Sequence, residues 1–139
     1  MTNGAYTAKA IICFEQQILL QLRDNIDGIH YPDHWGLFGG EVELGETSEE
    51  AIERELAEEL LLTNCRATLM FDWQNPETGS VLDFFWVESE IPFASLKLQE
   101  GQRMRLFPLS ELHYMKVTPD IMVNLDKIKN CMEGSFTVS

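Results

Sequence analysis

The sequence predicts a layered α+β domain. Stretches rich in apolar and β-branched residues recur along the chain, and turn-forming residues separate them. One helical pattern interrupts these stretches near the middle, and a second closes the chain. The 139 residues are enough for a single hydrophobic core, so we expect one domain over residues 1–139.

The N-terminal part predicts a β-hairpin followed by a loop. Residues 6–14 (YTAKAIICF) and 17–24 (QILLQLRD) are strand-like, and only a couple of polar residues separate them. Residues 24–33 turn polar and contain glycine, which is typical of a surface loop. Residues 34–40 (HWGLFGG) then predict a short strand that ends at a double glycine.

The C-terminal half predicts three more strands and a final helix. Residues 65–74 and 80–90 are strand-like on either side of the turn sequence NPETG, and residues 103–109 are a further strand. A helix is expected over residues 118–132, because threonine followed by proline favours a helix start. Apolar residues recur inside this helix: Ile121, Leu125 and Ile128.

The charge of the chain is strongly acidic and unevenly distributed. The net charge is −13, from 10 basic and 23 acidic residues. This argues against sequence-independent binding to nucleic acids or anionic membranes, because both need a basic surface. Residues 41–59 hold nine glutamates and one arginine. Such a concentrated acidic site suits a divalent cation better than it suits a phosphate alone.

The cysteines and the N-terminus indicate a cytoplasmic protein. The 3 cysteines are widely spaced and form no CxxC pair, which predicts free thiols in a reducing compartment. The first residues have no basic region followed by a long apolar run, and no segment approaches the length of a membrane span.

The acidic stretch predicts a glycine turn followed by a capped helix. Gly39 and Gly40 permit backbone conformations that are closed to other residues. Thr47, with Glu50 three residues later, forms a capping box that should start the helix. Its buried stripe is predicted from residues four apart: Ile52, Leu56 and Leu60.

Three carboxylates share another face of this helix. Glu55, Glu58 and Glu59 stand at i, i+3 and i+4, so their Cβ atoms lie about 5–6 Å apart. The spacing is unfavourable for bare carboxylates but favourable if Mg²⁺ takes them as oxygen ligands. A glutamate-rich helix is more often only a solvated face. Two features argue against that reading here: Arg54 is the single basic partner, and the preceding glycine turn offers carbonyls to a metal.

From Gly40 onward the chain reads glycine, five residues, Glu46, seven residues, and then RELAEE, which begins at Arg54. This pattern resembles the Nudix box, G-x5-E-x7-R-E-U-x-E-E-x-G-U, in which U is a bulky aliphatic residue. Leu61 is the one departure, because the family has glycine there. The strands around the box and the final helix extend the resemblance over essentially the whole chain. The resemblance implies the Nudix fold, an α/β/α sandwich with a mixed β-sheet between helices.

The resemblance also implies an activity and a set of site residues. Nudix enzymes hydrolyse a nucleoside diphosphate linked to another group, using Mg²⁺ or Mn²⁺ to neutralise the pyrophosphate. Arg54 is expected to orient the box glutamates by ion pairs, and Glu46 to tie the loop to the helix. The implied metal ligands are Glu55, Glu58, Glu59 and a backbone carbonyl of Gly40 or Gly39, with Gly39 also beside the substrate. Glu58 is at the centre of the three, so it is the first choice for substitution in a test of the metal site.

Three further residues outside the box are implied by resemblance to MutT-like members. Glu100, in a Glu-Gly-Gln setting before a strand, matches a residue that serves some members as the general base, while others use a box glutamate. Arg23 matches a position that contacts the substrate phosphates, and Asp120 matches one that contacts the base. Each has an ordinary alternative: a turn glutamate, a surface arginine and a first-turn acid favoured by the helix dipole.

The expected substrate is a small nucleotide, either a nucleoside triphosphate or a nucleotide sugar, with no nucleic-acid or membrane partner. Relatives of this kind are often homodimers. The alternative is a catalytically silent Nudix-fold module with a nucleotide-binding or regulatory role, although such modules usually lose box carboxylates.

The helix of the box ends in leucines, where the family has glycine. We expect this helix to run past Leu61, with Asn64 taking the left-handed conformation that glycine would otherwise supply.

Overall fold

The computed structural model describes residues 5–137, and side chains as far as residue 134. Within this range the chain forms two compact units, each built from two segments. The first unit contains residues up to 12 together with residues 38–99, and the second contains residues 13–37 together with those from 100 onward. Strand β1 (Tyr6–Phe14) runs from the first unit into the second.

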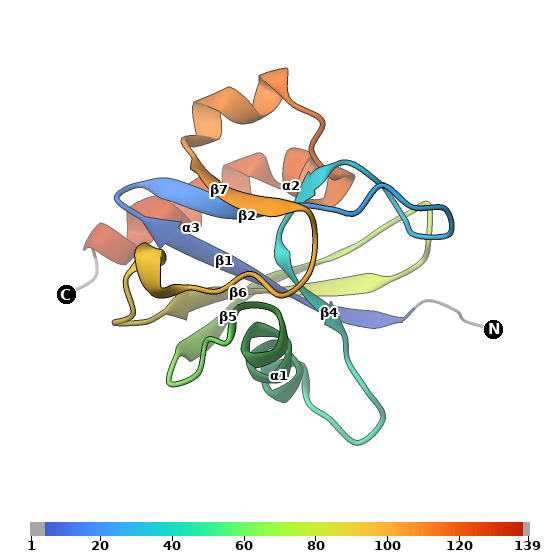
Figure 1. The fold of residues 1–139 in the computed structure, drawn as a ribbon, viewed down its shortest axis with the longest axis horizontal. Coiled ribbons are helices and arrows are strands. Elements are labelled where there is room, and N and C mark those ends of the chain that lie inside the picture. The colour runs from blue at the N-terminus through green and yellow to red at the C-terminus, as the bar shows by residue number, and fades with distance from the viewer. Residues whose placement is uncertain (1–4, 138–139) are drawn as a thin grey trace. The chain divides into compact units, whose positions relative to one another are not determined.

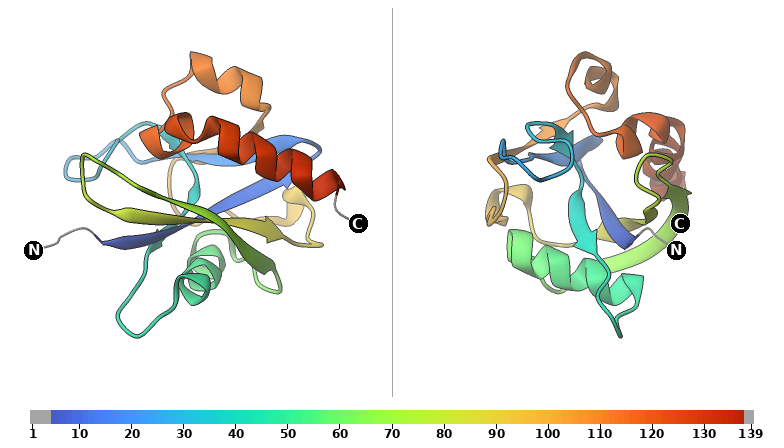
Figure 2. Two further views of the ribbon diagram at one scale, coloured as in Figure 1. Left: turned by 180° about the vertical axis from the view of Figure 1, so that it is seen from behind. Right: turned by 90° about the vertical axis from the view of Figure 1, so that its right-hand side faces the viewer.

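The first unit contains a mixed β-sheet. Strand β1 pairs parallel with β6 (Val81–Glu88) and antiparallel with β4 (Phe38–Glu41). Strand β5 (Arg66–Gln74) completes the sheet as the antiparallel partner of β6, in the hairpin drawn from green to yellow in Figures 1 and 2. Alternation of buried and exposed positions is interrupted in β5 by a register shift between Leu69 and Phe71.

Helix α1 (Ser48–Leu60) packs against β4, β5 and β6 of this sheet (Figure 1). The predicted capping box is confirmed: Thr47 Oγ1 accepts from the backbone N–H of Glu50, whose side chain accepts from the N–H of Thr47. The predicted stripe is also buried, because Ile52, Leu56 and Leu60 are at most 1% exposed. Burial of each such side chain contributes about 1.5–3 kcal/mol.

The second unit contains an antiparallel sheet around β2 (Gln17–Leu22). Strand β2 pairs with β7 (Arg103–Phe107), with the short β3 (Trp35–Gly36) and with the last residues of β1. Residues 116–118 are held to β3 by two hydrogen bonds, from Trp35 N–H to the carbonyl of Lys116 and from Thr118 N–H to the carbonyl of Trp35. This pairing places Thr118 beside β3.

The predicted C-terminal helix is divided in two. Helix α2 (Pro119–Val123) ends at Asn124, and α3 (Leu125–Thr137) follows at once. The side-chain amide of Asn124 donates to the carbonyl of Asp120 at 2.7 Å, and its backbone N–H donates to Ile121 three residues back. The Asn124 side chain thus takes the carbonyl that its own backbone N–H would bond in a continuous α-helix, which is how asparagine disturbs helix interiors.

Two 3₁₀ helices, η1 (Phe93–Ser95) and η2 (Leu109–Tyr114), complete the described elements. Within residues 5–137, no helix combines the length and the apolar character that crossing a bilayer requires.

Candidate functional site

The glycine turn before α1 is shaped around a carboxylate. A β carbon on Gly40 would overlap the carboxylate of Glu55, so a larger residue there would displace that side chain. Gly39 has φ +140°, and a β carbon on it would overlap the carbonyl of Ala8 on β1. The double glycine is therefore required by close approach on both sides, and it lets Glu55 lie directly against the backbone.

The second carboxylate at this turn belongs to Glu59, which is only 5% exposed. Its Oε1 accepts a hydrogen bond of 2.9 Å from the backbone N–H of Gly39. Oxygens of Glu55 and Glu59 lie within 4.8 Å of each other. Two converging carboxylates beside a bare backbone turn are a donor set that fits Mg²⁺ or Mn²⁺, which prefer oxygen ligands.

Arg54 is the cation that organises the rest of the box. Its Nε and Nη2 donate to the two oxygens of Glu46 at 2.6 and 3.1 Å, a bidentate pair. Its Nη1 donates to Glu55 at 3.0 Å and to Glu58 at 3.3 Å, and Nη2 also reaches the carbonyl of Glu41. The hydrogen bonds to Glu46 and, to a lesser extent, to Glu55 raise the pKa of Arg54 above its ordinary value, and the bond from Arg54 lowers the pKa of Glu46.

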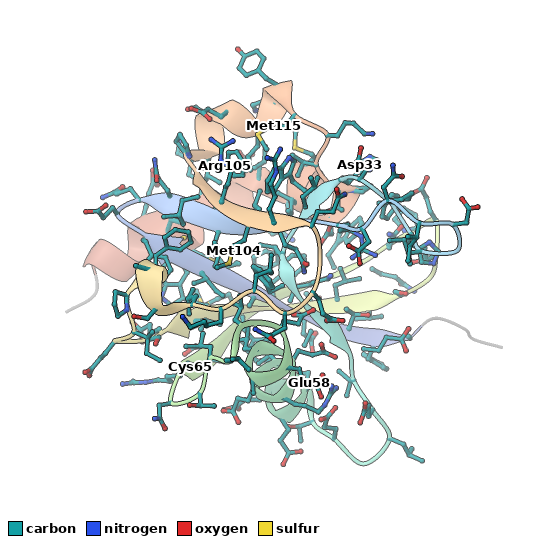
Figure 3. All side chains as sticks on the ribbon, viewed as in Figure 1. Asp33, Glu58, Cys65, Met104, Arg105 and Met115 are labelled. Carbon is teal, nitrogen blue, oxygen red and sulfur yellow. The ribbon has the colours of Figure 1, made fainter. Side chains whose placement is uncertain are left out.

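Glu58 differs from its two neighbours. Its side chain is 58% exposed, compared with 14% for Glu55, and it is labelled on α1 in Figure 3. Its Oε1 accepts the hydrogen bond from Arg54 at the surface of the helix. Glu55 and Glu59, rather than Glu58, therefore form the buried part of the cluster, and the assignment of Glu58 as a ligand stays a prediction.

The prediction for the end of α1 is wrong. The helix stops at Leu60, and Leu61 itself is left-handed, with φ 53° and ψ 31°. Asn64 is left-handed too, at φ 55°, but beyond the cap. The helix end is fixed by the chain around it: backbone N–H groups of Lys97 and Gln99 donate to the carbonyls of Leu60 and Glu59.

Packing explains why leucine is tolerated at that cap. Leu61 is 57% exposed, whereas Leu62 next to it is 1% exposed. Burial of Leu62 offsets the strain of about 1–2 kcal/mol that a left-handed leucine brings. The N–H groups of Leu61 and Leu62 also satisfy the carbonyls of Ala57 and Leu56 at 3.1 Å, so the end needs no glycine.

Arg23 lies in the second unit at the end of β2. Its Nε donates to the carbonyl of His30 at 2.9 Å, and its own carbonyl accepts from the side chain of Gln102. Gln102 also bonds Asp33 (labelled in Figure 3), which is left-handed at φ 59°. Arg23 is therefore held by the loop that follows it and is half-buried.

Thr118 and Asp120 present an unusual pair of buried oxygens in the same unit. The two residues are 5% and 6% exposed, and Thr118 Oγ1 and Asp120 Oδ2 have no hydrogen-bond partner among the described residues. A buried polar atom without a partner costs about 1–3 kcal/mol. Thr118 is not among the predicted site residues, because a threonine before Pro-Asp is explained as a helix start.

Glu100 is exposed and stands in a bend directly before β7, as the first residue of this segment of the second unit. The cysteines play no part in the candidate site: all three are free, and burial raises the pKa of the Cys13 thiol to about 12. The box residues come together within the first unit, and Arg23 and Asp120 belong to the second.

Comparisons with known proteins agree with this arrangement. The family model of the NUDIX domain matches residues 5–125. Among solved structures, a mutT/nudix family protein from Listeria innocua is 21% identical, with TM-score 0.77 over 100% of both chains. A MutT NUDIX hydrolase from Burkholderia pseudomallei is 24% identical, with TM-score 0.75 over 91% of this chain and 98% of its own.

A third structure contains a ligand. The NUDIX domain of NrtR from Shewanella oneidensis, in complex with ADP ribose, is 16% identical, with TM-score 0.73 over 95% of this chain and 90% of its own. None of the curated proteins compared with the chain matches it. The family model covers most of the sequence, and the mixed sheet, the helices and the box agree with it; the chain has the α+β Nudix fold and belongs to the Nudix family.

Proposed function

We propose that this protein is a metal-dependent pyrophosphohydrolase that acts on a nucleoside diphosphate derivative, such as a nucleoside triphosphate or a nucleotide sugar. In this reaction water attacks one phosphorus atom of the pyrophosphate, and the bridging P–O bond breaks to leave two phosphate-bearing products. The observation that carries the proposal is the pair of converging carboxylates of α1, Glu55 and Glu59, which lie against a glycine turn that has no room for a side chain.

The proposed cofactor is Mg²⁺ or Mn²⁺, held by Glu55 and Glu59, with Glu58 and the carbonyl of Gly40 as further proposed ligands. When bound, the metal would neutralise the pyrophosphate and polarise the attacked phosphoryl group. The chain's own contribution is to fix the carboxylates beforehand. Gly39 N–H holds one and Arg54 holds the other, so little reorganisation is needed when the metal binds.

The proposed roles in the second unit concern the substrate. Arg23, whose Nε is already bonded to the chain, keeps its terminal nitrogens for phosphate, which a guanidinium binds in bidentate fashion. Asp120, buried with one oxygen lacking a partner, is proposed to contact the base. Glu100 is one proposed general base, and a box glutamate is the other.

A panel assay tests this function. The protein is incubated with nucleoside triphosphates, nucleotide sugars, dinucleoside polyphosphates and ADP-ribose, with Mg²⁺, with Mn²⁺ and with excess chelator, and phosphate or pyrophosphate release is measured. We expect turnover of at least one class that the chelator abolishes. Absence of turnover on every member with both metals would reject the hydrolase.

A second candidate is a silent nucleotide-binding module, which the ADP ribose complex of the NrtR domain makes worth testing. It predicts that a panel member binds in calorimetry but is not cleaved. The intact set of box carboxylates favours the enzyme.

A comparison of Glu100→Gln with Glu55→Gln by pH–rate profile would then separate the two proposed bases, because only loss of the base removes the limb at acid pH.

A further inference from the structure

The loop between β2 and β3 has an unusual backbone. Two of its residues other than glycine, Tyr31 and Asp33, have positive φ values of 53° and 59°. Side chains disfavour this conformation, and it persists only where the surrounding structure holds it. The contacts that hold this loop therefore indicate what the fold keeps in place.

The loop fixes the direction of the Arg23 side chain. The backbone N–H of Arg23 donates to the carbonyl of His34, and its Nε donates to the carbonyl of His30, both at 2.9 Å. The backbone N–H of Asp33 closes the loop by donating to the carbonyl of Asp24 at 3.2 Å. A change in the shape of the loop would therefore move the terminal nitrogens of Arg23, which are the donors proposed to bind phosphate.

Gln102, in the bend before β7, fastens the loop from outside. Its side-chain amide donates to the carbonyl of Arg23 at 2.8 Å and to Oδ1 of Asp33, labelled in Figure 3, at 3.1 Å. The residue is exposed, so these two bonds, and not burial, hold its side chain. Because Arg23 and Asp33 stand at opposite ends of the loop, one amide group joins both ends.

The backbone of Gln102 is held independently of its side chain. Its N–H donates to the carbonyl of Leu22 at 2.8 Å. Gly101 before it has φ +82°, and a β carbon there would lie 2.6 Å from Oε1 of Gln21 and 3.0 Å from the carbonyl of Leu22. Only glycine allows the chain to pass this close to β2. The side chain of Gln102 can therefore be replaced while the main chain keeps the residue beside β2.

We propose that Gln102 is a positioning residue, which joins the two ends of the loop and thereby holds the guanidinium of Arg23 where it binds the substrate phosphates. The inference rests on the proposed function, because phosphate binding by Arg23 is part of that function. Gln102 acts through Arg23 and touches no reacting atom. A group that is held in place beforehand loses less conformational entropy when the substrate binds, and a displacement of about 1 Å can reduce the rate about 100-fold.

A double-mutant cycle tests whether Gln102 acts through Arg23. Gln102→Met keeps the length of the side chain but removes both donors, and Arg23→Met removes the guanidinium. Gln102→Met should lower kcat/KM for a cleaved panel substrate about tenfold, chiefly through KM, because the phosphates are bound before the reaction too. In the Arg23→Met background the same change should have no further effect. Losses that multiply, a loss confined to kcat, or full activity in Gln102→Met would overturn the inference.

Further variants assign the effect to the two hydrogen bonds. Gln102→Glu has nearly the same shape but only accepts, and it faces Asp33, so its loss should at least equal that of Gln102→Met. Asp33→Leu removes one acceptor and should reproduce part of the loss, whereas Asp33→Asn still offers an oxygen and should restore activity. Gln74→Met on β5 is the matched control, since that amide also donates to a backbone carbonyl, at Gly79. An equal loss in the control would contradict the inference.

Binding measurements separate this inference from the proposed function. Calorimetry with Mg²⁺ measures the affinity of all four proteins of the cycle for a methylene-bridged analogue of the cleaved substrate, or of ATP if none is cleaved. If hydrolysis occurs but the losses multiply, the inference fails while the hydrolase stands. If nothing is cleaved, binding decides alone. A loss of affinity in Gln102→Met that disappears in the Arg23→Met background upholds the inference, and absence of binding or of this coupling refutes it.

Discussion

Two regions of the molecule bury oxygen atoms, and they do so in opposite ways. In the first unit the carboxylates around α1 receive donors from their own surroundings: Gly39 N–H bonds Glu59, and Arg54 bonds Glu46 and Glu55. In the second unit Thr118 Oγ1 and Asp120 Oδ2 receive none among the described residues.

The difference indicates two kinds of recognition. Carboxylates that are fixed by hydrogen bonds still have lone pairs for a metal, since each oxygen can accept more than one bond. A buried oxygen that has no donor can accept a hydrogen bond from an N–H group of a ligand. On the proposed function, the first region holds the metal and the second contacts the substrate.

The strongest test of the charged region removes one of its central carboxylates. Glu55→Gln and Glu59→Gln should each reduce kcat/KM at least about 100-fold, because a bound metal contributes several kcal/mol of transition-state stabilisation. The measurement is turnover of a panel substrate, with Mg²⁺ titrated to separate affinity from rate. Glu53→Gln, an exposed glutamate on the same helix, is the matched control; an equal loss in that variant would contradict the assignment.

The glycine turn can be tested without touching a carboxylate. Gly40→Ala places a methyl group where the Glu55 carboxylate lies, and displacement of a supporting contact of this kind typically costs 10–100-fold in activity or metal affinity. Gly134→Ala, on α3, is the control, because a β carbon there meets nothing within 4 Å and the backbone is not in the left-handed region. Full activity in Gly40→Ala would show that Glu55 need not contact the turn.

The Arg54–Glu46 pair predicts a pH dependence of stability. Because Arg54 lowers the pKa of Glu46 below its ordinary value of 4.5, this interaction stabilises the fold fully above that pH and is lost as the pH falls through the lowered pKa. Glu46→Gln should therefore lower the urea midpoint at neutral pH, and the difference from the unchanged protein should shrink on acidification. A difference that grows as the pH falls would have the wrong sign.

The smallest expected effect concerns the helix cap. Leu61→Gly should raise the free energy of unfolding by up to about 1 kcal/mol. The substitution removes the strain of a left-handed leucine, but it also raises the conformational entropy of the unfolded chain, which offsets part of the gain. Leu61 is 57% exposed, so little packing is lost. Asn64→Gly should gain less, because asparagine tolerates this conformation. Activity should be unchanged, and a loss in Leu61→Gly would connect the cap to the site.

Much of the fold was predictable because the relevant information is local. The strand and helix positions follow from apolar periodicity and turn residues, and the start of α1 follows from the capping box at Thr47 and Glu50. The prediction failed at Leu61 and within the last helix. There the outcome depends on partners far away or on competition by a side chain: Lys97 and Gln99 fix the end of α1, and Asn124 interrupts the final helix.

The candidate site divides along the same line. By itself the sequence determined the family, the acidic helix face and the glycine turn. All three depend on the box, which is one continuous stretch of chain. Only the tertiary structure decided that Glu55 and Glu59 are the buried pair, with Glu58 exposed, and that Thr118 turns from its helix toward Gly36. The physical reason is that burial and the absence of a hydrogen-bond partner depend on residues distant in sequence, which no local pattern records.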